Sequence, residues 1–132
     1  MKKTFMLLIT LSIFISCKSQ TNNTVEANKI KQTSQVLDIA SFKNGINTSN
    51  IQLIDVRTPK EYEEGHIENA FLIDFLSDNF KEKIQELDKE KPVYLYCRSG
   101  NRSGKAAKLL LELEFKEIYD LEGGFLAWEK QN

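Results

Sequence analysis

The sequence is poor in the residues that build metal centres. Its 132 residues include one histidine and two cysteines, Cys17 and Cys97. A protein metal site usually gathers several histidine, cysteine or carboxylate ligands at characteristic spacings, and no such cluster is present. We therefore predict neither a bound metal nor another cofactor.

The sequence also lacks an excess of positive charge. It has 18 Lys and Arg residues against 19 Asp and Glu residues, a formal net charge of -1. A domain that binds nucleic acid is usually much more basic, so we expect no nucleic-acid partner. With 41% hydrophobic residues, the length suits one compact α/β or α+β domain and leaves no room for two. We expect a monomer.

The apolar run from Phe5 to Ile15 is too short to span a bilayer, which needs roughly 20 residues. Because two lysines precede it, the run is typical of an export signal. It ends in "FISC" (Phe14–Cys17), which resembles a bacterial lipoprotein signal that is cleaved before Cys17, although Phe14 stands where Leu is usual. The thiol of Cys17 would then carry a lipid. A plain secretory signal with an incidental cysteine is the alternative.

We accordingly divide the chain into a signal peptide (1–16), a tether (17–35) and a folded domain (36–132). The tether is polar and has few side chains that could form a core. A flexible segment of about 18 residues would hold the domain roughly 20–25 Å from its anchor. The expected location is the bacterial cell envelope, anchored to a membrane through the lipid on Cys17, with the periplasmic side favoured.

Strand and helix patterns alternate through the folded domain. After a short strand near Val36, strands are predicted at 51–55, 70–73, 92–96 and 117–121. Helices are predicted over 77–88, 102–114 and 124–130. Two more are predicted from their caps: one is capped by Asp38 and stops at Gly45, and the other begins with a capping box formed by Thr58 and Glu61. This alternation predicts an α/β fold with a mainly parallel sheet, whose ligands bind at the carboxyl ends of the strands. Cys97 lies at such an end.

The segment "VYLYCRSGNRSGKAA" (93–107) departs from ordinary helix chemistry. A helix begins just after Cys97, yet cations (Arg98, Arg102 and Lys105) stand where acidic residues are preferred. A tight loop of backbone N–H groups and a helix dipole would lower the pKa of the Cys97 thiol. The cations would then serve a thiolate and an anionic substrate. A buried structural cysteine is the alternative.

Two other interpretations of this segment were considered. A nucleotide-binding P-loop does not fit, because Ser99 stands at the position of its first glycine and Ala106 at that of its Mg²⁺-binding Ser or Thr. A disulfide between the two cysteines is conceivable, but a lipidated Cys17 cannot form one. Cys97 would then be a free thiol in an oxidising compartment, which marks a candidate reactive group.

Three landmarks give the domain a close resemblance to single-domain rhodaneses, which are thiosulfate or persulfide sulfurtransferases. They are "IDVRTPKEYEEGHIENA" (54–70), "CRSGNRS" (97–103) and "LEGGFLAW" (121–128). The resemblance covers residues 36–130 and implies a five-stranded parallel sheet with helices on both faces. It also implies that Cys97 accepts a sulfane sulfur as a persulfide and passes it on to a thiophilic acceptor.

The resemblance assigns roles to the loop residues. Arg102, the fifth residue after Cys97, matches the loop length of the sulfurtransferases; related phosphatases have a loop one residue longer, which would put their Arg at Ser103. Arg102 would hold a small anionic sulfur donor. The remaining implied residues are the backbone N–H donors from Arg98, Ser99, Gly100, Asn101 and Arg102, and the supporting residues Asp55, Arg57 and Ser103. With no second thiol to resolve the persulfide, the acceptor would be cyanide, glutathione or a protein thiol.

Some positions depart from the family pattern. Glu68-Asn69-Ala70 replaces Pro-Gly-Ala, and Asn69 can adopt the left-handed backbone of that turn. Glu114 stands where a helix-ending glycine is usual. We interpret His66 as a packing and hydrogen-bonding residue. Two other functions stay open: a phosphatase or arsenate reductase on the same fold, and a binding module that carries sulfur or senses oxidants without rapid turnover.

Overall fold

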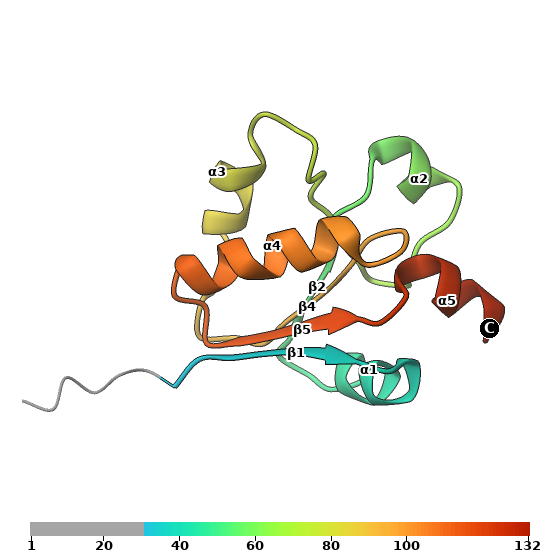
Figure 1. Ribbon diagram of the computed structural model, residues 1–132, viewed down its shortest axis with the longest axis horizontal. Helices are drawn as coiled ribbons and strands as arrows, with labels where there is room; N and C mark the ends of the chain where they lie inside the picture. Colours follow the sequence, from blue (N-terminus) through green and yellow to red (C-terminus); the bar gives the residue numbers. More distant parts are fainter. Residues whose placement is uncertain (1–30) are drawn as a thin grey trace, which may run out of the picture.

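The computed structural model describes residues 31–132 (Figure 1). The predicted signal peptide, the predicted lipidation site Cys17 and most of the predicted tether lie outside the described residues. Within residues 31–132, no helix is long and apolar enough to cross a membrane.

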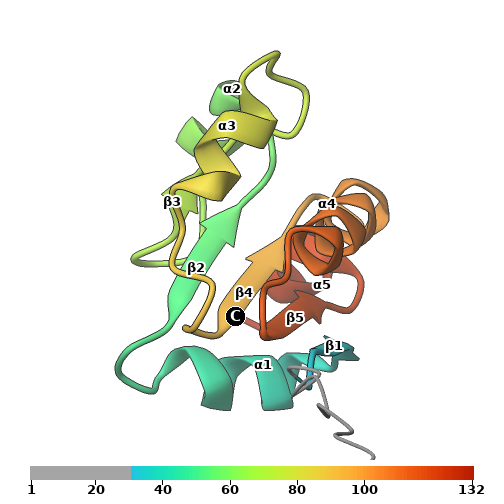
Figure 2. The same cartoon turned by 90° about the vertical axis from the view of Figure 1, so that its left-hand side faces the viewer.

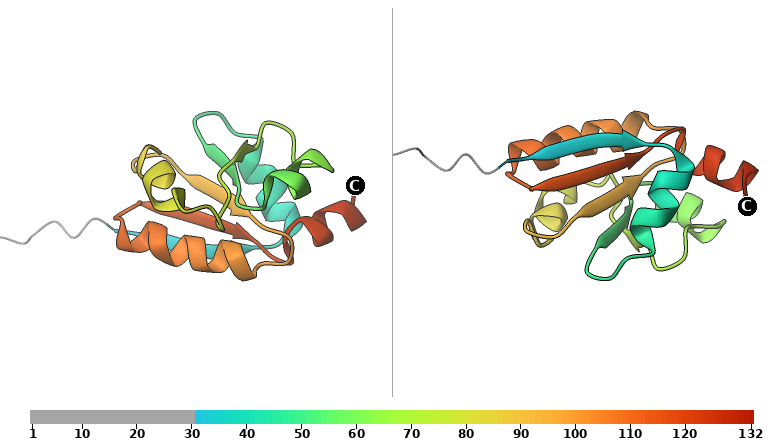
Figure 3. Two further views of the ribbon diagram at one scale, coloured as in Figure 1. Left: turned by 90° about the horizontal axis from the view of Figure 1, so that it is seen from above. Right: turned by 90° about the horizontal axis from the view of Figure 1, so that it is seen from below.

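Five strands form one sheet, in the order β1-β5-β4-β2-β3, and every neighbouring pair is parallel. The parallel α/β architecture predicted from the sequence is confirmed. Figure 3 shows β1, β5 and β4 side by side from below. The strands are β1 (Thr33–Leu37), β2 (Gln52–Asp55), β3 (Phe71–Leu72), β4 (Val93–Tyr96) and β5 (Glu117–Leu121).

Strand β1 begins earlier than predicted. Thr33–Gln35, which we assigned to the tether, pair in register with Glu117–Tyr119 of β5. The side chains of Ser34, Gln35 and Val36 are exposed, so this edge strand is held through its backbone. Backbone pairing leaves no apolar pattern in the sequence, which is why composition alone placed the start of the domain too late.

Helices cover both faces of the sheet. The helices are α1 (Ile39–Ile46), α2 (Pro59–Glu63), α3 (Phe80–Gln85), α4 (Asn101–Glu112) and α5 (Gly124–Lys130). Helices α3 and α4 pack on one face around Ile84 and Leu110. Helices α1 and α5 pack on the other around Phe42 and Phe125. Figure 2 shows α1 and α4 on opposite sides of the sheet. All four residues of β4 are buried, as expected for a strand covered on both faces.

Local signals placed the helix starts well. The side chain of Asp38 accepts a hydrogen bond from the Ser41 N–H and caps α1, and Thr58 and Glu61 form the predicted capping box of α2. The predicted left-handed backbone at Asn69 is confirmed (φ 65°), and Glu114 adopts the same conformation (φ 66°) where a glycine usually ends the helix. Helix α3 is shorter than the predicted 77–88, because a turn occupies Ser77–Asn79 and the helix ends at Gln85.

Candidate active site

The loop after β4 turns sharply around Cys97. Gly100 is the N-cap of α4 and has φ 106°, a conformation that side chains rarely adopt. Helix α4 begins at Asn101, one residue before the predicted start. The turn brings the first residues of α4 back over the end of β4, so that the thiol meets the N-terminus of the helix.

The thiol of Cys97 lies inside this turn, with 1% of the residue exposed. Its Sγ accepts hydrogen bonds from the N–H of Gly100 (3.0 Å) and from the hydroxyl of Ser103 (3.4 Å). Burial is the largest influence on the Cys97 pKa and raises it, but hydrogen bonds from the Ser103 side chain and from the backbone of Ser103, Gly100 and Ser99 bring the pKa below its ordinary value. The site therefore favours a thiolate.

The start of α5 lies directly against this loop. The N–H of Phe125 donates to the Cys97 carbonyl (2.8 Å), and the N–H of Leu126 donates to the Arg98 carbonyl (3.0 Å). A Cβ on Gly124 would lie 2.5 Å from the Cys97 carbonyl oxygen, a distance that only glycine avoids. Gly124 also has φ 59°, a conformation that favours glycine, so both the close contact and the backbone require a residue without a side chain. Two landmarks far apart in the sequence thus form one structural unit.

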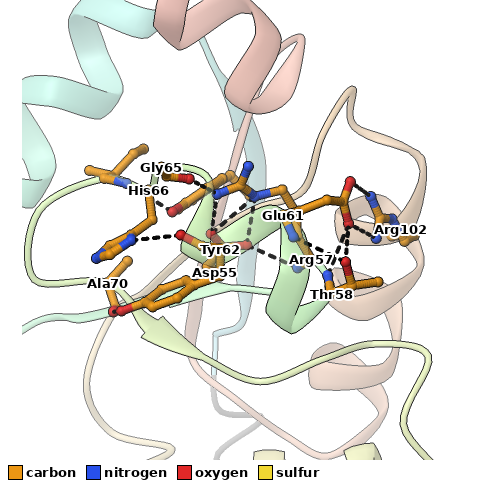
Figure 4. A network of polar contacts seen from close by, with 11 residues as sticks. Asp55, Arg57, Thr58, Glu61, Tyr62, Gly65, His66, Ala70 and Arg102 are labelled. Carbon is orange, nitrogen blue, oxygen red and sulfur yellow. Dashed lines mark hydrogen bonds and ion pairs between the residues drawn. The ribbon is translucent and has the colours of Figure 1, made fainter.

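A buried ion pair lies at the end of β2 (Figure 4). Arg57 donates to both carboxylate oxygens of Asp55 at 2.7–3.0 Å and to the Gly65 carbonyl at 2.6 Å. Its guanidinium lies 3.9 Å from the ring centre of Phe125. Burial acts most strongly on the Arg57 pKa and lowers it, but contacts with Asp55 raise the pKa overall. The predicted polar network is present, and it supports α5, which in turn holds the Cys97 loop.

Arg102 lies in an ion pair that the sequence did not indicate. Its guanidinium donates to both carboxylate oxygens of Glu61, at 2.8 and 2.7 Å (Figure 4). The hydrogen bonds from Arg102 are the main cause that lowers the pKa of Glu61 to about 2. A sulfur donor that binds Arg102 must therefore compete with the Glu61 carboxylate for the guanidinium.

The other predicted loop residues, Arg98, Ser99 and Asn101, are exposed at the rim, as is the cation Lys105. His66 is also exposed; its ring stacks on Tyr62 with centroids 3.7 Å apart, and its Nδ1 lies 2.9 Å from the Tyr62 carbonyl oxygen. These contacts match the packing and hydrogen-bonding role that we predicted for His66.

A cavity of about 570 Å³ lies away from the active loop, and none of residues 97–103 lines it. It is lined mainly by the end of α1 and by residues of the segments 47–53 and 67–71. A hollow of about 70 Å³ lies beside the loop, where Arg57, Glu61 and Arg98 meet. A hollow of this volume suits a small substrate.

Sequence reasoning missed two contributors to the site. Glu61 was recognised only as a capping residue, and its distance from Arg102 in the sequence hid their contact. Asp120 received no role, although it is buried at the end of β5 and its Oδ1 has no hydrogen-bond partner. An acidic residue between Tyr119 and Leu121 in a strand that pairs on both sides was the available signal.

Comparison with known proteins decides the family. Residues 38–131 match the family described as "Rhodanese-like domain". The chain belongs to the rhodanese-like family. In a solved structure, a rhodanese-related protein from Thermoplasma volcanium has this fold with a TM-score of 0.66 and 30% identity, over 74% of this chain and 93% of that one. The fold and the family expected from the three landmarks are thereby confirmed.

Curated relatives of this rhodanese-like protein have different names, and the name of one relative states no activity. The thiosulfate sulfurtransferase GlpE of Coxiella burnetii (strain RSA 331 / Henzerling II) is 40% identical over 84 residues, 64% of this chain and 77% of the relative. The uncharacterized protein YqhL of Bacillus subtilis is 48% identical over 77 residues, 58% of this chain and 60% of the relative. A tRNA uridine(34) hydroxylase of Cytophaga hutchinsonii is 38% identical over 101 residues, 74% of this chain but 32% of that longer protein.

Proposed function

We propose that this rhodanese-like protein is a sulfurtransferase. It moves a sulfane sulfur from thiosulfate or a persulfide donor to a thiophilic acceptor, with Cys97 as the sulfur carrier. The observation that carries the proposal is the position of the Cys97 Sγ, which accepts hydrogen bonds from Gly100 and Ser103 at the N-terminus of α4. The similarity to a thiosulfate sulfurtransferase supports the same conclusion.

The first half-reaction loads the sulfur. The Cys97 thiolate attacks the outer sulfur of thiosulfate, a new S–S bond forms, and the old S–S bond breaks with its electron pair leaving on sulfite. The product is a Cys97 persulfide, whose terminal sulfur is an anion. Backbone N–H groups of residues 98–102, together with the dipole of α4, would stabilise this charge.

The second half-reaction discharges the sulfur. An acceptor thiolate or cyanide attacks the terminal sulfur, and the Cys97 thiolate leaves. The hydrogen bonds that lower the Cys97 pKa make its thiolate a better leaving group and a more populated form of the side chain. Among the residues described, Cys97 is the sole free cysteine, so the acceptor thiol must come from another molecule.

The test is sulfur transfer by the purified protein. With thiosulfate and cyanide, we expect thiocyanate to form, and mass spectrometry should find one added sulfur on the peptide that contains Cys97. Cys97→Ser should abolish both signals, while Ser99→Ala, which changes an exposed side chain in the same loop, should retain them. Thiocyanate formation that persists in Cys97→Ser would refute the mechanism. Hydrolysis of phosphate esters without sulfur uptake would favour a phosphatase instead.

A second candidate function is a sulfur carrier or oxidant sensor that does not turn over rapidly. The burial of Cys97, with 1% of the residue exposed, favours it, because a thiol this buried would need a protein partner to become accessible. Under this function, the Cys97 persulfide forms but thiocyanate accumulates no faster than in a protein-free control.

We further propose that the protein is anchored in the bacterial cell envelope through a lipid on Cys17. Thr33 begins β1 and Cys97 follows the last residue of β4, so the two residues lie at opposite ends of the parallel strands. An anchor before Thr33 would therefore leave the active loop at the far end of the strands. Cys17→Ser should release the protein from the membrane fraction, and unchanged retention would refute lipidation.

A further inference from the structure

Asp120 is a buried carboxyl group to which the proposed mechanism gives no role. Only 5% of the residue is exposed, and its Oδ1 has no hydrogen-bond partner. Burying a carboxyl group without full hydrogen bonding costs free energy, so such a group in a strand usually has a structural or functional role. Its position next to the active loop suggests one.

The sheet register places Asp120 beside the reactive thiol. In β5 it pairs with Leu95 of β4, two residues before Cys97, so the side chains of Leu95 and Cys97 point to the same face. Helix α4 covers that face. A Cβ on Gly104 of α4 would lie 3.8 Å from the Asp120 Oδ2, so the carboxyl group packs against the first turn of α4, where Ser103 lies.

Ser103 therefore lies between two acceptors. Its hydroxyl is 3.4 Å from the Cys97 Sγ, and hydrogen bonding by the same side chain is among the influences that lower the Asp120 pKa. A hydroxyl has one proton to donate, so it can serve only one of them at a time. We propose that Asp120 is a positioning residue that decides which acceptor receives the Ser103 proton and so sets the basicity of the Cys97 thiol.

The two protonation states of Asp120 have opposite effects. When protonated, Asp120 can donate to the Ser103 oxygen, which leaves the Ser103 proton for the Cys97 thiolate. When ionised, Asp120 competes for that proton, so the thiolate loses a hydrogen bond and becomes less stable. Burial is the main cause that raises the pKa of Asp120 to about 6, so the change falls just below neutral pH.

No charged side chain is among the influences on the Asp120 carboxyl group. The influences on the Asp120 pKa are burial, the Ser103 side chain and the Leu121 backbone N–H, and none of them is a charged side chain. Val36 of β1 and Leu95 of β4 are its register neighbours. Of the cations in the first turns of α4, Arg102 pairs with Glu61, and Lys105 is exposed.

The test is a titration of the Cys97 thiolate, followed by its ultraviolet absorbance over roughly pH 4–9, with Cys97→Ser as the blank. Coupling to Asp120 should spread the wild-type titration over a wider pH range than one independent group would show. Asp120→Asn keeps a donor for Ser103 but cannot ionise. In this variant, the Cys97 thiolate should titrate over a narrower pH range and at lower pH. Glu122→Gln, which removes an exposed charge from the same segment, is the control and should behave as the wild type.

A double variant isolates the role of Ser103. In a Ser103→Ala background, Asp120→Asn should shift the titration by less than about half as much as it does alone. Superimposable wild-type and Asp120→Asn titrations would overturn the inference. If Asp120→Asn does not fold, the comparison of wild type with Ser103→Ala decides, because loss of Ser103 should by itself narrow the titration and an equally broad curve would reject the coupling.

The consequences for turnover rest on the proposed function, but the titration does not. A shifted titration without sulfur transfer would reject the sulfurtransferase and keep the role of Asp120. Sulfur transfer with an unshifted titration would do the reverse.

Discussion

Arg102 and Glu61, 41 positions apart in the sequence, form a two-point ion pair that joins α4 to α2. The Glu61 carboxylate also accepts from the N–H and hydroxyl of Thr58 at the start of α2. One carboxylate thus completes a helix cap and holds the arginine that the family resemblance assigns to the sulfur donor. Breaking this pair has separable effects on stability and on donor binding.

Glu61→Gln should destabilise the protein at neutral pH. The Glu61 pKa is lowered from 4.5 to about 2, mainly by hydrogen bonds from Arg102. Its contribution is therefore fully present above about pH 4.5 and is lost as the pH falls through about 2. The shift corresponds to about 3 kcal/mol, which solvent screening of the part-exposed pair reduces to about 1–2 kcal/mol.

Urea unfolding of the wild type and Glu61→Gln at pH 7 and near pH 2 checks this prediction. The difference in unfolding free energy should shrink at the lower pH. Glu64→Gln, an exposed carboxylate at the end of α2, is the control and should leave stability nearly unchanged. An acid-independent difference would show that the ion pair is not its source.

Arg102→Ala should raise the KM for thiosulfate by about tenfold, because an ionic hydrogen bond to the donor is worth about 1.5–3 kcal/mol. The matched variant is Glu61→Gln, which breaks the same ion pair but leaves the guanidinium free. Its KM should be equal to or lower than that of the wild type. If both variants raise KM equally, Arg102 acts only by holding α2, and its predicted role in donor binding is wrong.

Ser103→Ala should raise the pKa of the Cys97 thiol, because the Ser103 hydroxyl is among the donors that lower it. At a pH below the wild-type plateau, the rate of Cys97 alkylation by iodoacetamide should fall by roughly tenfold. The pH profile should move to higher pH with a similar plateau. Ser99→Ala keeps its backbone N–H and should not move the profile; an unshifted profile for Ser103→Ala would remove Ser103 from the site.

Asp120→Asn should stabilise the protein above about pH 6. Burial raises the pKa of Asp120 from 3.8 to about 6, so the folded state binds this proton more tightly than the unfolded state. The associated stability is present below about pH 3.8 and is lost as the pH rises through 6. Thermal unfolding should show a gain of up to about 3 kcal/mol at pH 8 and almost none at pH 4. A gain that does not depend on pH would contradict this assignment.

Gly124→Ala should cost about 2–4 kcal/mol of stability and should lower persulfide loading of Cys97. The new Cβ would clash with the Cys97 and Arg98 backbone, so either α5 or the loop must move. Gly104→Ala is the control, since its Cβ would make only ordinary contacts. Normal loading of Gly124→Ala would show that α5 does not fix the loop.

Local sequence signals carried much of the fold. Several elements depend on interactions within a few residues, so each was predicted from the neighbouring residues in the sequence. They are the caps at Asp38 and Thr58, the apolar strands β2 and β4, and the left-handed turn at Asn69. The start of β1 was not, because it is fixed by backbone pairing with β5, to which its exposed side chains contribute little.

The sequence by itself determined the alternation of strands and helices and a cysteine at the end of a strand, followed by a glycine that can turn the chain. Tertiary structure alone decided that Glu61 holds Arg102, that Gly124 packs on the Cys97 loop and that Asp120 lies beside Ser103. The reason is the strand order. Because β5 and β2 lie on either side of β4, three segments that are distant in the sequence meet at the carboxyl ends of the strands, where the thiol lies.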